Sequence, residues 1–211
     1  MNKGKFITLE GGEGVGKSTN LAFIEKNLIS AGIDVLTTRE PGGTQLGEAL
    51  RDLLLGDDAE GIGAKAEMLT VFAARAEHLE KVILPALGKG QWVLCDRFTD
   101  ATYAYQGGGR GLPFSQIEII ENWVQGELRP DMTLLLDAPV EMGMARAAAR
   151  GAADRFEREP LAFFRAVSEA YRQRASASPE RYAVIDASQP LDDVQAQIAQ
   201  ILNHLLDQGD K

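Results

Sequence analysis

Cysteine and long apolar runs are scarce in this 211-residue sequence, and each scarcity excludes a class of protein. The single cysteine, Cys95, has no partner for an internal disulfide, so we expect a reducing compartment and a structural role in a buried strand. No apolar run approaches the roughly 20 residues of a membrane span, and the first residues lack a signal-peptide pattern. We therefore expect a cytoplasmic protein without membrane segments.

Positive charge is also in short supply. Lys and Arg number 22 against 31 Asp and Glu, which gives a net charge of −9. A protein that binds duplex nucleic acid normally presents a basic surface, so this balance argues against a nucleic-acid partner. A local cluster of arginines could still hold a small anionic ligand within an acidic protein.

Histidine is rare as well, which bears on metal sites and catalytic triads. The two histidines, His78 and His204, fall on separate predicted helices without metal-ligand spacing, and we expect both at the surface. No Ser-His-Asp order and no pair of cysteines can be proposed. The chemistry must come from other residues.

Apolar segments instead alternate between strand and helix patterns. Short apolar or β-branched runs predict strands at residues 6–9, 34–38, 93–95, 131–137 and 181–186. Helical spacing predicts helices from residue 21 to Gly32, at 48–55, at 66–83 with Leu69 and Ala76 on the apolar face, and at 191–206. This alternation predicts a single domain, residues 1–211, with a three-layer α/β/α architecture around a five-stranded parallel sheet.

Polar stretches follow four of the predicted strands. They lie at residues 11–18, at 39–43, at 96–97 and from 137 onward. Ligands of parallel α/β sheets bind at the carboxyl ends of the strands. We therefore expect the functional site there.

The first stretch, GGEGVGKS, matches the phosphate-binding pattern G-x-x-x-x-G-K-[ST] of P-loop NTPases, between a strand and a helix. Backbone N–H groups at the start of a helix favour an anion. We expect Lys17 to reach the β- and γ-phosphates of a nucleotide and the Ser18 hydroxyl to bind Mg²⁺. The predicted nucleotide-binding residues are Gly11, Gly12, Glu13, Gly14, Val15, Gly16, Lys17, Ser18 and Thr19.

Arginines follow the next two strands. Arg39 ends the second predicted strand, Arg51 lies on the helix after it, and Arg97 follows Asp96 at the end of the third strand. Guanidinium groups match phosphate oxygens well, so together they favour a second phosphate-bearing substrate that faces the nucleotide. A surface ion pair explains Arg51 alone equally well.

Six segments resemble the bacterial form of the thymidylate kinase family. They are LEGGEGVGKST, TREPGGT, FAAR, CDRF and ATYAYQGGGRG between Leu9 and Gly111, and then ARAAARGAADRFE at 145–157. The resemblance implies a nucleoside monophosphate kinase-like fold and transfer of the γ-phosphoryl group of ATP to dTMP with Mg²⁺. It also implies a homodimer, for which Trp123 on a helix at 118–125 is either a core or an interface residue.

The resemblance assigns the acceptor site residue by residue. It implies that Arg39, Arg51 and Arg97 hold the phosphate of dTMP. Arg75 is expected to hydrogen-bond thymine O4, and Gln106 to read the other polar edge of the base. Wrong bases would leave these groups unpaired.

Other acceptor residues follow from the same resemblance. Tyr105 is expected near the sugar, and Thr102 near the base or its waters. Many relatives stack an aromatic residue on thymine where this chain has Val71. Phe72 is the nearest candidate, for which stacking and core packing are equally supported.

Two acids are assigned to the phosphates. The resemblance implies that Glu13 organises the acceptor and its metal or water shell, and Asp96 can serve the metal through water while ordering Arg97. The acceptor phosphate is largely dianionic near neutral pH and is already a nucleophile, so neither acid need be a strong base. Catalysis then rests on alignment and charge neutralisation.

A mobile lid is predicted at about residues 145–158, where Arg146, Arg150, Arg155 and Arg158 gather. The phosphate loop contains no arginine, and relatives of this type use lid arginines for the charge of the transferring group. Arg150 and Arg155 are the leading candidates, and Arg146 is also expected at ATP. A solvated basic face is the open alternative.

A nucleotide-dependent switch such as a small GTPase is the rival class. It would need an Asn-Lys-x-Asp guanine reader after a late strand, and this sequence has none. Other nucleoside monophosphate kinases share the phosphate loop but not the AYQ and FAAR segments. The sequence therefore favours dTMP as the acceptor.

Overall fold

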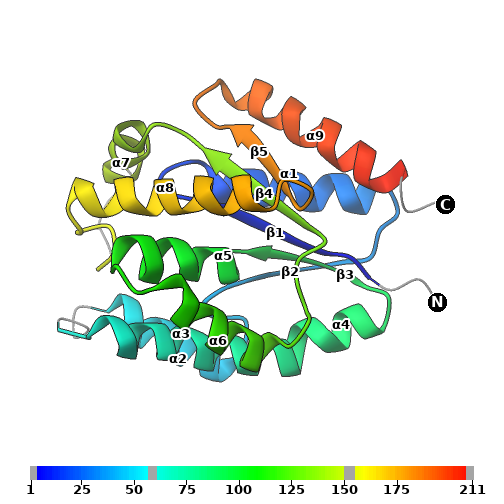
Figure 1. Cartoon of the computed structure of the whole chain (residues 1–211). Helices are drawn as coiled ribbons and strands as arrows, with labels where there is room; N and C mark the ends of the chain where they lie inside the picture. Colours follow the sequence, from blue (N-terminus) through cyan, green and yellow to red (C-terminus); the bar gives the residue numbers. More distant parts are fainter. Residues whose placement is uncertain (1–3, 57–60, 150–154, 208–211) are drawn as a thin grey trace.

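The computed structural model describes residues 4–56, 61–149 and 155–207 (Figure 1). In this part of the chain five parallel strands form one sheet in the order β2-β3-β1-β4-β5. The strands are β1 (Phe6–Gly11), β2 (Val35–Arg39), β3 (Trp92–Asp96), β4 (Met132–Asp137) and β5 (Tyr182–Asp186). The predicted five-stranded parallel sheet is confirmed.

Helices cover both faces of this sheet (Figure 1). They are α1 (Lys17–Ser30), α2 (Gln45–Leu55), α3 (Ala64–His78), the π-helical η2 (Leu79–Ile83), α4 (Leu84–Gly88), α5 (Thr99–Thr102), the π-helical η3 (Tyr103–Gly109), α6 (Phe114–Gln125), α7 (Val140–Ala148), α8 (Leu161–Ala177) and α9 (Leu191–Asp207). None of these described helices combines the length and apolar composition of a membrane span.

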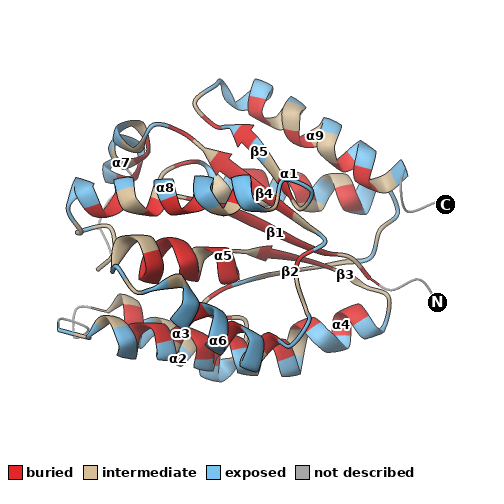
Figure 2. Cartoon of the chain, viewed as in Figure 1, coloured by how far each residue is buried: buried red, intermediate tan, exposed pale blue. Residues whose placement is uncertain are grey.

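Buried residues lie on both faces of the sheet (Figure 2), and the two faces have separate apolar cores. On one face Ile7 and Leu9 of β1 pack with Ile24 of α1 and Ile198 of α9. Because alternate strand residues point to opposite faces, Phe6 packs on the other side against η2 and α4. Thr8 and Glu10 share that side and are fully buried, so polar groups lie beneath the helices that form the site.

The buried face of α3 differs from the predicted one. Leu69 is 54% exposed and Ala76 is also exposed, whereas Glu67, Arg75 and His78 are buried. The expectation of a surface His78 was therefore wrong. The apolar pattern misplaced this face because the polar side chains are paired inside the protein and need no water.

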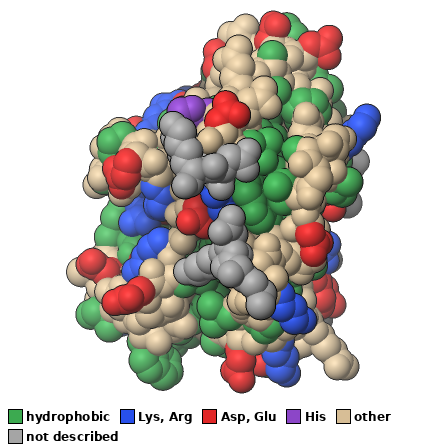
Figure 3. All heavy atoms as spheres, turned by 90° about the vertical axis from the view of Figure 1, so that its right-hand side faces the viewer, with side chains coloured by type: hydrophobic (Ala, Val, Ile, Leu, Met, Phe, Trp, Pro, Cys, Tyr) green, Lys and Arg blue, Asp and Glu red, His purple; other side chains and the backbone are tan. Residues whose placement is uncertain are grey.

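The register of the strands gathers the predicted polar stretches at one edge. Asp96 lies level with Leu9 of β1 and with Arg39 of β2, and the phosphate loop follows β1 directly. The opposite end of the molecule, where both termini emerge, shows acidic and basic side chains scattered among hydrophobic ones (Figure 3). The site is built at the carboxyl edge of β1, β2 and β3.

Candidate active site

The loop between β1 and α1 has the conformation of an anion cradle. Gly14 has φ +67°, and a Cβ there would collide with the backbone oxygen of Gly143. Gly16 is left-handed and precedes the first residue of α1, so N–H groups at the start of the helix face the loop. Lys17 Nζ donates to Gly12 O at 2.6 Å and to Gly11 O at 3.2 Å, which curls its side chain over the loop.

A cavity of about 270 Å³ opens beside this loop. Its phosphate side is lined by residues 13–18, Arg51, Asp96 and Arg97, and its far side includes Arg75, Thr102, Tyr105 and Gln106. Segments after β1, β2 and β3 thus meet α3 and η3 around one space. Most of the residues predicted for the nucleotide and the acceptor are brought together here.

Arg97 is fixed between the loop and the cavity. Its backbone is left-handed, with φ +66°, although it is not a glycine. Its Nη1 donates to Gly11 O at 2.9 Å, and its Nη2 donates to Glu13 Oε1 at 2.7 Å and to Tyr105 Oη at 2.9 Å. Tyr105 Oη in turn donates to Glu13 Oε1 at 2.5 Å. Burial, together with Glu13, holds the pKa of Tyr105 well above its ordinary value, so its hydroxyl keeps the proton that it donates.

The buried carboxyl group of Glu10 holds two neighbours of Arg97, the backbone of Phe98 and the hydroxyl of Tyr171, which accepts a hydrogen bond from Arg97 Nη1 at 3.2 Å. Glu10 Oε1 accepts a hydrogen bond from the N–H of Phe98 at 2.7 Å, and Glu10 Oε2 accepts one from Tyr171 Oη at 2.8 Å. Burial, and secondarily the charge of Asp100, raises the pKa of Glu10 to about 8. Sequence reasoning missed Glu10 because it lies between the apolar residues of β1 and the phosphate loop, where a carboxylate is expected to face solvent.

Arg75 crosses the protein interior and reaches the cavity. Its Nε donates to Glu40 Oε2 at 2.7 Å and its Nη2 to Thr102 Oγ1 at 3.0 Å. The other oxygen of Glu40 lies 3.0 Å from His78 Nδ1, and His78 Nε2 is 2.7 Å from Thr38 Oγ1. Arg75 Nη1 has no hydrogen-bond partner among the described residues, which leaves a buried donor for a ligand oxygen.

Comparison with known proteins identifies the family. A family model described as thymidylate kinase matches residues 9–198. The chain belongs to the thymidylate kinase family.

Members of the thymidylate kinase family match nearly the whole chain. The thymidylate kinase of Pseudomonas savastanoi pv. phaseolicola (strain 1448A / Race 6) is 59% identical over 204 residues, which cover 97% of each chain. That of Ectopseudomonas mendocina (strain ymp) is 60% identical over 204 residues, again 97% of each chain. The solved structure of the Ehrlichia chaffeensis thymidylate kinase superimposes with a TM-score of 0.77 at 32% identity, covering 96% of this chain and 99% of that one. The resemblance and the nucleoside monophosphate kinase-like fold are confirmed.

Two of the residues predicted for the acceptor lie outside the cavity. Arg39, whose side chain is 53% exposed, pairs with Glu48 at 2.7 Å and does not line the cavity. Phe72 is buried in a cluster with Met68 and Tyr103, whereas its neighbour Val71 lines the cavity. The structure therefore favours the packing alternative for Phe72.

Two of the arginines predicted for the lid, Arg146 and Arg155, contact different parts of the protein. Arg146 Nη1 donates to Ala187 O at 3.0 Å, away from the cavity lining. Arg155 donates through Nε to Leu54 O at 2.8 Å and through Nη2 to Glu67 Oε2 at 2.5 Å. Arg150 lies outside the described residues. The role of these arginines in phosphoryl transfer stays a prediction.

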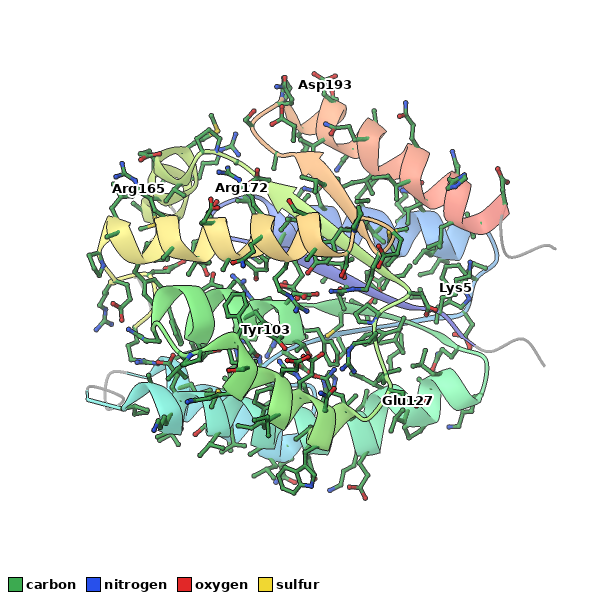
Figure 4. All side chains as sticks on the ribbon, viewed as in Figure 1. Lys5, Tyr103, Glu127, Arg165, Arg172 and Asp193 are labelled. Atoms are coloured by element: carbon green, nitrogen blue, oxygen red, sulfur yellow. The ribbon has the colours of Figure 1, made fainter. Side chains whose placement is uncertain are left out.

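The fourth polar stretch borders a second cavity, in which Asp137 and Ala138 lie beside Gly11, Gly12 and Glu13 of the phosphate loop. Asp137, at the end of β4, pairs with Arg172 of α8, whose Nε lies 3.0 Å from Asp137 Oδ2. Figure 4 shows Arg172 on α8 together with the exposed Arg165. Asp137 does not line the main cavity.

The phosphate side of the cavity fits Mg²⁺. No group of three or more His, Cys, Asp or Glu side chains that could hold a metal occurs in the described part of the chain. Asp96 Oδ1, however, is buried without a hydrogen-bond partner among those residues, and Ser18 lines the same cavity. Mg²⁺ in phosphate sites keeps several waters and binds through one or two protein oxygens and the substrate phosphates, so these two groups suit it.

The buried pair between Glu40 and Arg75 generates a prediction about stability. Glu40→Gln removes the charge that compensates a buried guanidinium, and we expect unfolding free energy to fall by about 3 kcal/mol or more. The matched control is Glu48→Gln, which breaks the exposed pair with Arg39 and should cost less than about 1 kcal/mol. Urea unfolding followed by circular dichroism measures both. Equal losses in the two variants would contradict the importance of the buried pair.

Proposed function

We propose that this chain transfers the γ-phosphoryl group of ATP to dTMP and releases dTDP and ADP, in the synthesis of dTTP. Membership of the thymidylate kinase family supports the reaction. The observation that carries the assignment to this cavity is its continuity from the phosphate loop to the unpaired donor of Arg75.

On the donor side, the loop at residues 11–18 holds the phosphates of ATP. The N–H groups at the start of α1 and the charge of Lys17 stabilise them. Ser18 and Asp96 would hold Mg²⁺, which neutralises phosphate charge when it is bound. Lys17 exchanges its present bonds to the carbonyls of Gly11 and Gly12 for phosphate oxygens.

On the acceptor side, the dTMP phosphate lies between Arg51 and Arg97, and Arg39, which lies outside the cavity lining, is a third candidate. Arg75 Nη1 donates to thymine O4, and Gln106 contacts the neighbouring edge of the base. The ring of Tyr105, fixed by Arg97 and Glu13, limits space beside the sugar. The reaction then consists of holding two phosphates in line and neutralising their charge.

The charge of the transferring group needs a further cation. We assign it to the lid at about 145–158, where Arg150 and Arg155 are the leading candidates and Arg146 follows. Arg155 is held by Leu54 and Glu67 on the acceptor side, so it would have to exchange these contacts to act on ATP. A closed lid would also exclude water from the phosphates.

The acceptor assignment is tested with a panel of monophosphates. With ATP as donor, dTMP should give a higher kcat/KM than CMP, AMP and GMP, because Arg75 and Gln106 match its base and those bases leave buried polar groups unpaired. The value for dTMP should also exceed that for dUMP, which has the same polar edge but lacks the apolar 5-methyl group that thymine buries. Coupled ADP release over dTMP, dUMP, CMP, AMP and GMP measures this. A reaction without monophosphate measures background ATP hydrolysis, and a better acceptor than dTMP would refute the assignment.

The state of Lys17 generates a pH prediction. Burial, and secondarily the charge of Arg97, lowers the pKa of Lys17 from 10.5 to about 8. Below that pH the amine of Lys17 is protonated and its charge attracts the phosphates of ATP. As the pH rises through about 8, the amine loses its proton and this attraction. The dissociation constant of MgATP should therefore rise about tenfold per pH unit above that point.

Isothermal titration between about pH 7 and pH 9.5 measures the slope. Lys17→Arg is the control, because a guanidinium stays charged over this range and the slope should disappear whatever the absolute affinity. A flat profile in the wild-type protein would contradict the lowered pKa.

We further propose a homodimer in the cytoplasm. The outer face of α6 exposes Ile119 by 70% and Trp123 by 85%, one helical turn apart. Two large apolar side chains that lie together and are mostly exposed favour a protein–protein interface on this face of α6. The buried, unpaired Cys95 is compatible with a reducing compartment.

A charge on α6 should separate the subunits. Trp123→Glu is expected to shift the wild-type dimer to the monomer in sedimentation velocity, since it places a carboxylate in an apolar contact. Ile29→Glu is the matched control, because Ile29 is an exposed apolar residue of α1, outside α6. A dimer that survives Trp123→Glu would place the interface elsewhere.

A further inference from the structure

Glu67 is a fully buried carboxylate that the mechanism above does not use. It lies in the first half of α3, behind the base end of the cavity, and its side chain is 0% exposed. Glu67 Oε1 accepts from Gln106 Nε2 at 2.9 Å, and Glu67 Oε2 accepts from Arg155 Nη2 at 2.5 Å. Arg110 Nε lies 3.2 Å from both oxygens. A carboxylate that is so completely desolvated must be paired, and here two guanidinium groups and one amide surround it.

The chemistry of these partners sets the orientation of Gln106. A carboxylate accepts hydrogen bonds and donates none, whereas the amide of glutamine has a donating nitrogen and an accepting oxygen. Glu67 can therefore bond only to the nitrogen of Gln106. The oxygen, Gln106 Oε1, makes no hydrogen bond with the described residues, and the Gln106 side chain lines the cavity. The amide thus offers an acceptor to the ligand.

This acceptor is complemented by the free donor of Arg75 in the same cavity. Thymine and uracil carry an accepting O4 beside a donating N3–H. Cytosine carries the reverse pair, an amino group beside an accepting N3. A donor from Arg75 and an acceptor from Gln106 match the first arrangement and oppose the second.

We propose that Glu67 determines base specificity as a positioning residue, by locking the amide of Gln106 with its oxygen toward the base. The proposal rests on the proposed function and deepens it. Arg110 and Arg155 neutralise Glu67, and Glu159 pairs with Arg110 at 2.5 Å from the other side. Without Glu67 the amide could turn over and present its nitrogen, which suits the N3 of cytosine.

The test compares three acceptors in the variant Glu67→Gln. The new amide can donate as well as accept, so it no longer dictates the orientation of Gln106. The ratio of kcat/KM for dTMP to that for dCMP should fall by about tenfold or more, since the turned amide leaves a buried hydrogen-bonding group of the base mismatched. The loss should lie mainly in KM for dTMP, and the ratio of dTMP to dUMP should stay unchanged because both bases share the same polar edge. KM for ATP should also stay constant.

Glu159→Gln is the matched control. Like Glu67→Gln, it replaces a carboxylate that pairs with Arg110 by a neutral amide. Glu159, however, does not contact Gln106. The three acceptors should keep their wild-type ratios in this variant. A fall in the dTMP to dCMP ratio in both variants would overturn the proposal, because it would trace the effect to Arg110 and the general charge balance.

Failure of the proposal and failure of the proposed function give different results. A wild-type protein that does not prefer dTMP refutes the function. A wild-type protein that prefers dTMP, together with a folded Glu67→Gln variant that keeps the dTMP to dCMP ratio, refutes only the role of Glu67. If Glu67→Gln does not fold, Glu67→Asp keeps the charge between Arg110 and Arg155 but withdraws it from Gln106, and the same fall is expected.

A measurement on the wild-type chain needs no variant. If Glu67 holds the amide nitrogen, a side-chain amide proton of Gln106 should exchange slowly with water in NMR spectra, both with and without dTMP. Rapid exchange of both protons in the unbound protein would overturn the proposal.

Discussion

The hydrogen bond from the Phe98 N–H to Glu10 is the interaction on which the geometry of the site depends. It holds the turn after β3 in which Arg97 has a left-handed backbone, a conformation that costs a non-glycine residue about 1 kcal/mol or more. This turn points the guanidinium back across β1 to the phosphate loop, where it meets Gly11 and Glu13. The donor loop and the acceptor cavity therefore share one fixed cation, and their relative position is set by the sheet.

The base end of the cavity is fixed by the pairing of buried charges. Buried charges are tolerated only where they are paired, so Arg75 lies against Glu40, and Glu67 lies against Arg110 and Arg155. Among the described residues, Nη1 of Arg75 and Oε1 of Gln106 make no hydrogen bond, and both side chains line the cavity. Pairing thus fixes both the positions of these groups and their donor or acceptor character, and the specificity of a rigid pocket comes from this combination.

The sequence predicted the sheet and the phosphate loop well because both depend on local patterns. Apolar runs identify parallel strands, and the spacing of glycine, lysine and serine identifies the loop. The partners of the buried side chains could not be predicted in this way. Glu10, Glu67 and His78 are buried although their types favour the surface, and each is explained only by a residue distant in sequence. Arg39 shows the converse, since a matching motif position does not reveal whether a side chain points into the cavity. Phe72, one residue after the position of the relatives' aromatic side chain, packs in the core instead.

The AYQGGG segment shows how packing joins the two ends of the site. In the π-helical η3, Tyr105 reaches Glu13 and Arg97, while the next residue, Gln106, reaches Glu67. Adjacent residues can serve the phosphate and the base only if η3 is held rigidly. Gly108 lets η3 approach α8 so closely that a Cβ there would meet the backbone oxygen of Ala166. Gly108 and Gly109 therefore act through the close contact of η3 with α8, which transmits the position of α8 to both Tyr105 and Gln106, whereas Gly107 faces Phe114 and Ile117 of α6.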